Sequence, residues 1–306
     1  MWRYFLQTRL VLIAFIFLLL VRGLNAAPLV DVEWLNQNIA KPDLVVLDIR
    51  SPNSRGNPFL NGHIPGARSA PYNRGWREKR DDLVGMLPQQ DRIVEHIRSV
   101  GVNANSHVVI VPHGRSSTDF AAATRVYWTF KVLGHATVSI LDGGYKAWQL
   151  SGGPLSYEVK AVAKGNFTGA YVASLLALES NVHQSLEKQT GLIDARPVSQ
   201  YEGRSKSAIV TRAGTIPGAF NVPHSNLYDA GSAKFASRSK IVEIALELGF
   251  ASSDDPIVVF CNTGHWASLA WFAFHEIKGD SNISVYDGSM TEWARKSSNP
   301  VEPGQR

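Results

Sequence analysis

The chain repeats itself: five short motifs of its first half return, in the same order, in its second half. The matched segments are LDIR at 47–50 with IDAR at 193–196, HIPGA at 63–67 with TIPGA at 215–219, IVE at 93–95 with IVE at 241–243, VVIV at 108–111 with IVVF at 257–260, and LDGGYKAW at 141–148 with YDGSMTEW at 286–293. The partners stay between 145 and 152 positions apart. Because a solenoid needs more and shorter repeats, this pattern predicts one fold used twice.

Each copy alternates short apolar runs with segments of helical periodicity, which predicts helices around a mostly parallel sheet. In the second copy we expect strands near 191–195, 257–260 and 283–286, and helices near 240–248, 267–276 and 291–296. The Asp-Gly pairs at 142–143 and 287–288 predict turns that start helices. The predicted fold class is therefore α/β, with two tandem domains that each have helices flanking a mostly parallel sheet.

The domain boundaries follow from local composition. Residues 1–27 hold Arg3 and Arg9, twelve apolar residues at 10–21 and a small-residue end, which is typical of a secretory signal peptide cut after Ala26. We expect an N-terminal domain at 28–152, a linker rich in Gly and polar residues at 153–167, and a C-terminal domain at 168–306. The leader predicts a periplasmic or secreted protein, or a membrane-anchored one if the leader stays uncleaved.

Charge and hydropathy exclude some classes of partner. Residues 1–27 carry three arginines and no Asp or Glu, so their removal lowers the formal net charge from +5 to +2. A charge this small predicts no nucleic-acid partner. The apolar run of the leader is shorter than the roughly 20 residues of a membrane-spanning helix, so we expect no stable membrane insertion after cleavage.

Cys261 is the only cysteine of the chain, and it follows the apolar run at 257–260. In an oxidising compartment a single cysteine makes no intramolecular disulfide, and catalysis is the simplest reason to keep a free thiol there. A strand that delivers the sulfur to a loop before a helix aims backbone N–H groups and the positive helix end at it. We therefore interpret Cys261 as a nucleophile, with a buried, inert thiol as the alternative.

The residues after Cys261 predict a cradle for an anionic sulfur. The candidates are Asn262, Thr263, Gly264, His265, Trp266 and Ala267. A half-protonated His265 would hold an anionic donor or favour the thiolate, and the alternative is a side chain that points to solvent. Trp266 is expected to wall the pocket. Ala267 stands where a phosphatase of the Cys-x₅-Arg type has its phosphate-binding arginine, which excludes phosphatase chemistry.

Two copies of the [HT]-I-P-G-A motif, two of D-G-x₄-W and one cysteine loop in the second copy together resemble the two-domain rhodanese sulfurtransferases. The resemblance implies a catalytic C-terminal domain, a non-catalytic N-terminal domain that has Pro112 in place of the cysteine, and an active site near the domain interface. It further implies that Cys261 takes a sulfur from a small donor, becomes a persulfide, and passes the sulfur to cyanide, a thiol or a partner protein. No metal or organic cofactor is implied.

The resemblance leaves the donor open. Thiosulfate or a similar sulfane donor is the leading prediction, 3-mercaptopyruvate is the alternative, and a sulfur carrier that does not turn over small donors is a third hypothesis. Asn262 and Thr263 are neutral, as in many 3-mercaptopyruvate-type loops, but Gly85 stands where many such members have a histidine. Gln200 stands where many two-domain members have an arginine, which removes one expected anion-binding charge.

Six further residues are candidates for donor binding: Arg196, Arg204, Arg212, Trp76, Arg74 and Arg77. The alternative for Arg196 is a structural ion pair with the nearby Asp194. Arg204 and Arg212 are close to Gln200 in the sequence and would supply its missing charge. The last three belong to a segment that resembles the interdomain-facing part of family members, with an ordinary solvated loop as the alternative.

Overall fold

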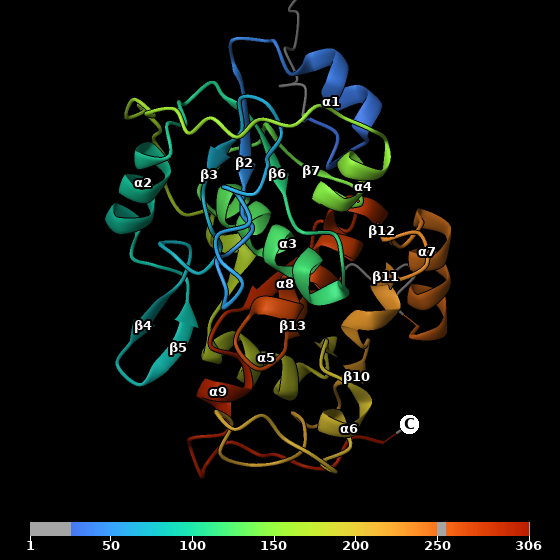
Figure 1. The fold of residues 1–306 in the computed structure, drawn as a ribbon. Helices are drawn as coiled ribbons and strands as arrows, with labels where there is room; N and C mark the ends of the chain where they lie inside the picture. Colours follow the sequence, from blue (N-terminus) through green and yellow to red (C-terminus); the bar gives the residue numbers. More distant parts are fainter. Residues whose placement is uncertain (1–25, 250–254, 306) are drawn as a thin grey trace, which may run out of the picture.

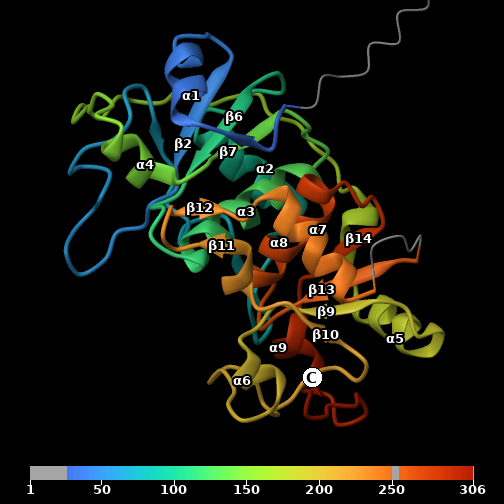
Figure 2. The ribbon, with the colours of Figure 1, turned by 90° about the vertical axis from the view of Figure 1, so that its right-hand side faces the viewer.

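The computed structural model describes residues 26–249 and 255–305. The predicted leader therefore lies outside the described residues, except for Ala26 and Ala27. Most of the N-terminal half of the chain lies in the upper part of Figure 1 and most of the C-terminal half in the lower part, and Figure 2 shows the same division from the side. Within the described ranges, no helix is both long enough and apolar enough to cross a membrane.

The N-terminal domain is built on a five-stranded sheet. In spatial order its strands are β1 (Leu29–Val30), β7 (Val138–Leu141), β6 (His107–Val111), β2 (Leu44–Asp48) and β3 (Arg68–Ser69), with helices α1 (Val32–Asn38), α2 (Gln90–Ser99), α3 (Ser117–Val132) and α4 (Gly144–Leu150). Every neighbouring pair of strands is parallel. The central strands are apolar and buried, as expected where helices cover both faces of a sheet.

The C-terminal domain repeats this sheet with the same strand order. Its strands are β8 (Leu176–Ala177), β14 (Ile283–Tyr286), β13 (Ile257–Phe260), β9 (Leu192–Asp194) and β10 (Phe220–Asn221), and its α-helices are α5 (Glu179–Lys188), α6 (Val198–Tyr201), α7 (Arg238–Glu247), α8 (His265–Trp271) and α9 (Ser289–Trp293). All pairs are again parallel. The predicted α/β fold class and the predicted strands of this copy are confirmed. The three predicted helices are present, and each begins two residues earlier than expected, as α7, α8 and α9. Helix α8 continues as a π-helix, η3 (Phe272–Lys278).

Short elements complete both domains. The 3₁₀ turns η1 (Ala173–Leu175) and η2 (His224–Leu227) flank the C-terminal sheet, and β11 (Tyr228–Asp229) pairs with β12 (Lys234–Phe235) in an antiparallel hairpin. A second hairpin, β4 (Glu78–Arg80) with β5 (Leu83–Met86), leaves the N-terminal domain and reaches α9 of the other domain. This β4–β5 hairpin brings N-terminal residues to the end of the C-terminal sheet.

The duplication extends to individual hydrogen bonds. Arg50 and Arg196 each pair with the aspartate two residues before them and donate to a glycine carbonyl, that of Gly62 and that of Gly214 respectively. The indoles of the tryptophans that end the two D-G-x₄-W motifs donate to the carbonyls of Pro154 and Pro300. The motifs repeated in the sequence are therefore the residues that hold each copy of the fold together.

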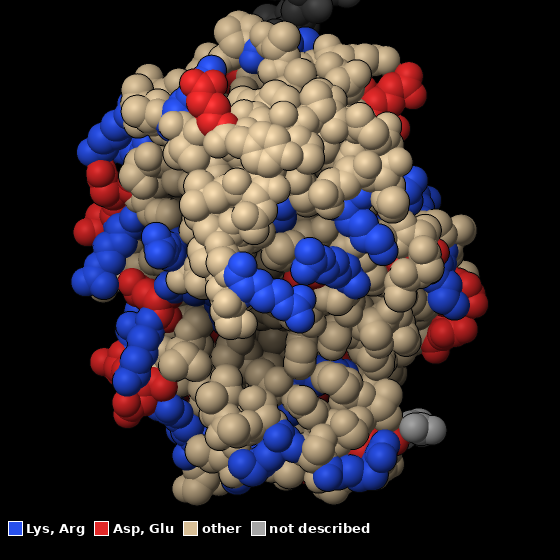
Figure 3. All heavy atoms as spheres, viewed as in Figure 1, with Lys and Arg blue, Asp and Glu red and all other residues tan. Residues whose placement is uncertain are grey.

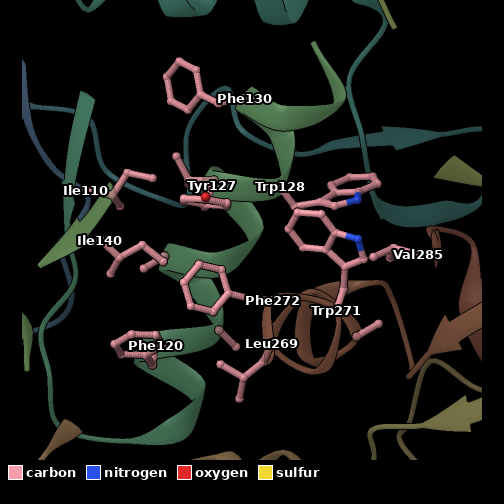
Figure 4. Packing of buried hydrophobic residues seen from close by; sticks show 14 of the residues in the cluster. Ile110, Phe120, Tyr127, Trp128, Phe130, Ile140, Leu269, Trp271, Phe272 and Val285 are labelled. Carbon is pink, nitrogen blue, oxygen red and sulfur yellow. The ribbon is translucent and has the colours of Figure 1, made fainter. Parts of the chain in front are cut away.

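The two domains share one hydrophobic core, and its centre is the contact of α3 with α8. Helix α3 is buried along most of its length because its own sheet covers one side and α8 the other. Figure 4 shows aromatic side chains of α3 facing Leu269, Trp271 and Phe272. The rings of Tyr127 and Phe272 meet edge to face with centroids 4.9 Å apart. This shared core fixes one domain against the other.

The segment predicted as the linker, 153–167, runs back over the N-terminal domain. Ser156 exchanges two backbone hydrogen bonds with His63, Gly165 donates to the carbonyl of Arg98, and the ring of Phe167 is buried in the shared core. The C-terminal sheet begins with β8. The linker is therefore packed onto the first domain.

Because the core is shared, we expect a cavity at the α3–α8 contact to destabilise both domains together. Leu269→Ala removes a fully buried side chain and should lower the free energy of unfolding by about 2–5 kcal/mol. Leu246→Ala removes a leucine that is 62% exposed and should change it by less than about 0.5 kcal/mol. Urea denaturation followed by tryptophan fluorescence measures both; equal midpoints, or two separate transitions in the wild type, would contradict the shared core.

Candidate active site

Cys261 lies in a cavity of about 540 Å³ formed where the two sheets face each other. The lining comes from the loops that follow β2 (residues 49–53), β6 (Pro112, His113) and β13 (Cys261, Asn262, Thr263), and from Tyr72, Arg77, Thr118, Asp119, Ala122, Ser207, Ile209, His265 and Trp266. Ligands of open parallel sheets bind outside the carboxyl ends of the strands, and three such ends meet here. Figure 3, viewed from the same side as Figure 1, shows a hollow at mid-height and Lys and Arg side chains next to Asp and Glu over this face.

Ser289 holds the backbone of the cysteine loop in place. Its hydroxyl accepts hydrogen bonds from the N–H groups of Cys261 (3.1 Å) and Gly264 (3.0 Å) and donates to the carbonyl of Tyr286 (2.7 Å). Ser289 has φ +50°, a left-handed conformation that costs a non-glycine residue free energy. Three hydrogen bonds to one buried hydroxyl offset that cost and fix the loop around a thiol that is only 1% exposed.

The N-terminal copy has the same loop scaffold without the chemistry. Tyr145 donates its N–H to Pro112 as Met290 does to Cys261. Gly144 has φ +59° and occupies the position of Ser289. Our sequence analysis missed Ser289. The signal was the match of Asp142-Gly143-Gly144 with Asp287-Gly288-Ser289, but a glycine at the first of these two positions gives no hint that the serine side chain is used at the second. The Asp-Gly turns before α4 and α9 are as predicted.

The loop after Cys261 leads into the first turn of α8, whose initial N–H groups have no partner within the helix. Gly264 supplies the left-handed turn, with φ +71°. Asn262 is fixed by a hydrogen bond from its amide to the side chain of Gln200 (2.9 Å), and its Oδ1 is buried without a protein partner among the described residues. Of the six predicted cradle residues, Asn262, Thr263, His265 and Trp266 line the cavity with Cys261, whereas Gly264 and Ala267 are buried and do not belong to the lining.

His265 is neutral, so the expectation of a half-protonated imidazole is wrong. Burial, with the guanidinium groups of Arg77 and Arg125 close by, lowers the pKa of His265 to about 3. Its Nδ1 lies 2.8 Å from the hydroxyl of Tyr72. The side chain faces the cavity and the other domain, and it contributes hydrogen bonding without a positive charge.

Trp266 walls the cavity, as expected. Its indole stacks on the ring of His224, with centroids 4.2 Å apart, and donates to the hydroxyl of Thr118 (3.2 Å). Burial lowers the pKa of His224 to about 4, so this stacked pair is also neutral.

Of the six residues predicted to bind the donor, Arg77 alone lines the cavity in the described part of the chain. The Arg196 guanidinium is fully buried and engaged by Asp194, which is the structural alternative. Arg204 pairs with Glu202 at the surface, and Arg212 donates to the carbonyls of Ala294 and Lys296. These three arginines do not line the cavity, and each donates to oxygen atoms close to it.

The other two candidates of the N-terminal segment also point elsewhere. Trp76 is fully buried in the hydrophobic core, where its indole donates to the carbonyl of Ala70. Arg74 is exposed and does not belong to the cavity lining. The expectation that Trp76 or one of the two nearby arginines faces the cleft is thus met by Arg77.

A buried ion pair between the domains lies behind the cysteine loop, and our sequence analysis missed it. Arg125 of α3 donates to Asp287 Oδ1 (2.5 Å), and the N–H of Leu87 donates to Asp287 Oδ2 (2.6 Å). The same guanidinium lies 3.3 Å from the carbonyl of Gly264. Nothing in the spacing of Arg125 within an apolar helix distinguishes it from a surface arginine, so no sequence signal was available.

The family model of the rhodanese-like domain matches this chain twice, at residues 31–151 and 178–296. The chain belongs to the rhodanese-like domain family. Both matches fall within the predicted domains, so the five repeated motifs belong to a duplication of this domain.

Curated relatives are similar to the chain over most of its length. The 3-mercaptopyruvate sulfurtransferase of Escherichia coli K12 is 28% identical, with 90% of this chain and 97% of the relative covered. The mitochondrial thiosulfate/3-mercaptopyruvate sulfurtransferase 1 of Arabidopsis thaliana is 28% identical, with coverages of 91% and 79%. A putative thiosulfate sulfurtransferase of Saccharopolyspora erythraea is 29% identical, with coverages of 90% and 96%. The chain is a rhodanese-family sulfurtransferase.

Solved structures share the fold. The crystal structure of SseA from Escherichia coli, one of the 3-mercaptopyruvate sulfotransferases, superposes with a TM-score of 0.72 at 27% identity over 86% of this chain and 99% of SseA. An anaerobic ergothioneine biosynthesis enzyme from Chlorobium limicola superposes with a TM-score of 0.74 at 22% identity, over 92% of this chain and 71% of that one. Within residues 26–249 and 255–305, no three His, Cys, Asp or Glu side chains are grouped as metal ligands.

We expect substitutions of Arg196 and Arg204 to differ in their effect on the free energy of unfolding. Arg196→Ala leaves the carboxylate of Asp194 buried without its partner and should lower the free energy of unfolding by about 3–5 kcal/mol. Arg204→Ala, at a side chain that is 62% exposed, should change it by less than about 0.5 kcal/mol. Chemical denaturation of both variants is the measurement, and equal effects would contradict the structural assignment of Arg196.

The low pKa of His265 predicts a dependence of stability on pH. In the unfolded chain the imidazole titrates near pH 6.5, whereas in the folded protein its pKa is about 3. The unfolded state binds the extra proton between these values, so the free energy of unfolding falls as the pH drops below 6.5, by about 1 kcal/mol per pH unit. His265→Gln removes this contribution. Urea denaturation at pH 7 and pH 5 should therefore show a smaller loss for His265→Gln than for the wild type; an equal loss would mean that His265 is protonated in the folded protein.

Proposed function

We propose that this sulfurtransferase carries sulfur as a persulfide on Cys261, which it receives from a small anionic donor and passes to a thiophilic acceptor. The observation that carries the proposal is the position of the thiol: it lies at the carboxyl end of β13, in a cavity, within a loop that Ser289 fixes and that leads into α8. A persulfide anion gains from fixed N–H groups that need no reorganisation during the reaction.

The charges of the cavity favour a donor with one negative charge. Arg50 is neutralised by its ion pair with Asp48, and burial lowers the pKa of His113 as it does that of His265, so both imidazoles are neutral. The remaining charged residues of the lining are Arg77 and Asp119. Arg77 can pair with the carboxylate of a donor, but Asp119 leaves the lining without net positive charge, so the second negative charge of the dianion thiosulfate would enter a partly buried site without a partner. We therefore propose 3-mercaptopyruvate as the preferred donor and thiosulfate as the poorer one, which reverses the order of our sequence analysis.

The proposed reaction has two steps. The Cys261 thiolate attacks the sulfur of 3-mercaptopyruvate, the carbon–sulfur bond breaks, and its electron pair leaves with the pyruvate enolate. The enolate takes the proton of the transferred thiol and becomes pyruvate, and Cys261 keeps a persulfide anion. Cyanide or a thiolate then attacks the outer sulfur, the sulfur–sulfur bond breaks, and the Cys261 thiolate is regenerated.

We also propose that the protein is exported and that its leader is cut after Ala26. Two contacts support this cleavage point: the carbonyl of Ala27 accepts from the hydroxyl of Ser139 (2.6 Å), and the carbonyl of Pro28 accepts from the N–H of Ile140 (2.9 Å). Cleavage after Ala26 keeps both contacts and the whole of β1. The proposed partners are the small donor and a small thiophilic acceptor or a partner protein, with neither nucleic acid nor a cofactor required.

The donor preference is tested by steady-state kinetics with cyanide as the common acceptor. We expect kcat/KM to be at least about tenfold higher for 3-mercaptopyruvate than for thiosulfate, because a second uncompensated charge costs more than 1 kcal/mol to bury. Cys261→Ser should be inactive with both donors and serves as the control. A preference for thiosulfate would overturn the charge argument, and turnover of neither donor would favour a carrier that a partner protein loads.

A further inference from the structure

The β4–β5 hairpin contains a bulge at Gly85. Glu78 pairs with Met86 and Lys79 with Val84, so Gly85 is the extra residue between two cross-strand pairs. It has φ +81°, the left-handed conformation of a glycine bulge. Bulges of this kind bend a strand and change the direction of nearby side chains.

The bulge lies next to the side chain of Arg77, the residue that precedes β4. A Cβ placed on Gly85 would lie 1.9 Å from Nη2 and 2.5 Å from Cζ of Arg77. The guanidinium thus occupies the space that a side chain at position 85 would need. Gly85 also accepts a hydrogen bond from Nε of Arg77 through its carbonyl (2.9 Å).

From its position over Gly85, Arg77 contacts the cysteine loop of the other domain. Its Nη2 donates to the carbonyl and to the hydroxyl of Thr263, both at 2.8 Å. These contacts and the one to Gly85 use three of the five N–H groups of the guanidinium. The two N–H groups on Nη1 are not used in these three contacts. The guanidinium also interacts with the side chain of Tyr72, and both residues line the cavity together with Cys261.

Among the described residues, the C-terminal domain contributes no Lys or Arg to the cavity lining. Gln200, which binds Asn262 next to the thiol, is a neutral amide. Arg196, Arg204 and Arg212 are engaged elsewhere. The positive charge beside Cys261 is therefore delivered by the N-terminal domain, although that domain has no thiol.

We propose that Arg77 binds the anionic group of the sulfur donor and that Gly85 determines this specificity, because its bulge and missing side chain make the room through which Arg77 enters the site. The inference rests on the proposed function and adds a residue for donor recognition and a residue that positions it. It predicts that a side chain at position 85 weakens donor binding only by displacing Arg77.

The test is a double-mutant comparison. Arg77→Ala and Gly85→Ala should each raise KM for 3-mercaptopyruvate about tenfold or more, with a smaller effect on kcat, since a charge-assisted hydrogen bond is lost. In the Arg77→Ala background, Gly85→Ala should raise KM no further. Arg77→Lys should recover part of the loss, because it keeps the charge and loses the fork geometry.

Matched controls separate this effect from backbone strain and from general charge. Gly66 has φ +77° with nothing within 4 Å of a built Cβ, so Gly66→Ala has the same backbone cost without displacing an arginine. Arg74→Ala removes an exposed arginine of the same segment. Both should leave KM unchanged. Additive effects of Arg77→Ala and Gly85→Ala, or equal effects of Gly85→Ala and Gly66→Ala, would overturn the inference.

Product binding provides a readout that does not need turnover. The dissociation constant of pyruvate, measured by the change in tryptophan fluorescence, should rise about tenfold in Arg77→Ala and in Gly85→Ala, and in neither control. If the wild type accepts sulfur from no donor, the proposed function fails while this comparison still decides the role of Arg77. If the wild type transfers sulfur and the dissociation constant of pyruvate is the same in Arg77→Ala, the proposed function stands and the inference fails.

Discussion

The buried ion pair of Arg125 and Asp287 is the contact on which the geometry of the site depends. It joins a helix of the first domain to the residue that follows β14 of the second, and neither side chain is more than 6% exposed. Removing either partner would leave a charge buried without compensation, which is far costlier than losing a surface pair. The guanidinium also lies beside Gly264, so the contact that holds the domains together also fixes the loop that carries the thiol.

The duplication explains how both domains line the cavity around Cys261 although one domain alone has a cysteine. The carboxyl ends of strands from both sheets meet at the cavity, so Pro112 and His113, the N-terminal counterparts of the cysteine loop, line it. The first copy has kept the scaffold and lost the thiol. The first copy also supplies Tyr72 and Arg77, which contact His265 and Thr263 of the second copy.

The fold was predictable because it depends on local patterns, and the nucleophilic role of Cys261 stays a prediction from patterns of the same kind. Repeated motifs, apolar strands and a cysteine between a strand and a helix are all visible within a few residues of one another. The donor-binding residues depend on long-range geometry: Arg196 looked like an anion site until Asp194 was seen to engage it, and Arg77 is distinguished from Arg74 only by the bulge at Gly85. Arg125 and Ser289 acquire their roles from contacts across 139 and 28 positions of the chain, which no short motif encodes.

We propose that the thiol of Cys261 stores the transferred sulfur. The most direct test is the intact mass of the protein, from which the leader has been removed, before and after incubation with 3-mercaptopyruvate and, separately, with thiosulfate, followed by fragmentation to locate the change. Our account predicts the gain of one sulfur atom at Cys261, more completely with 3-mercaptopyruvate, and no gain in Cys261→Ser. A sulfur gained by Cys261→Ser, or no gain by the wild type with either donor, would contradict it.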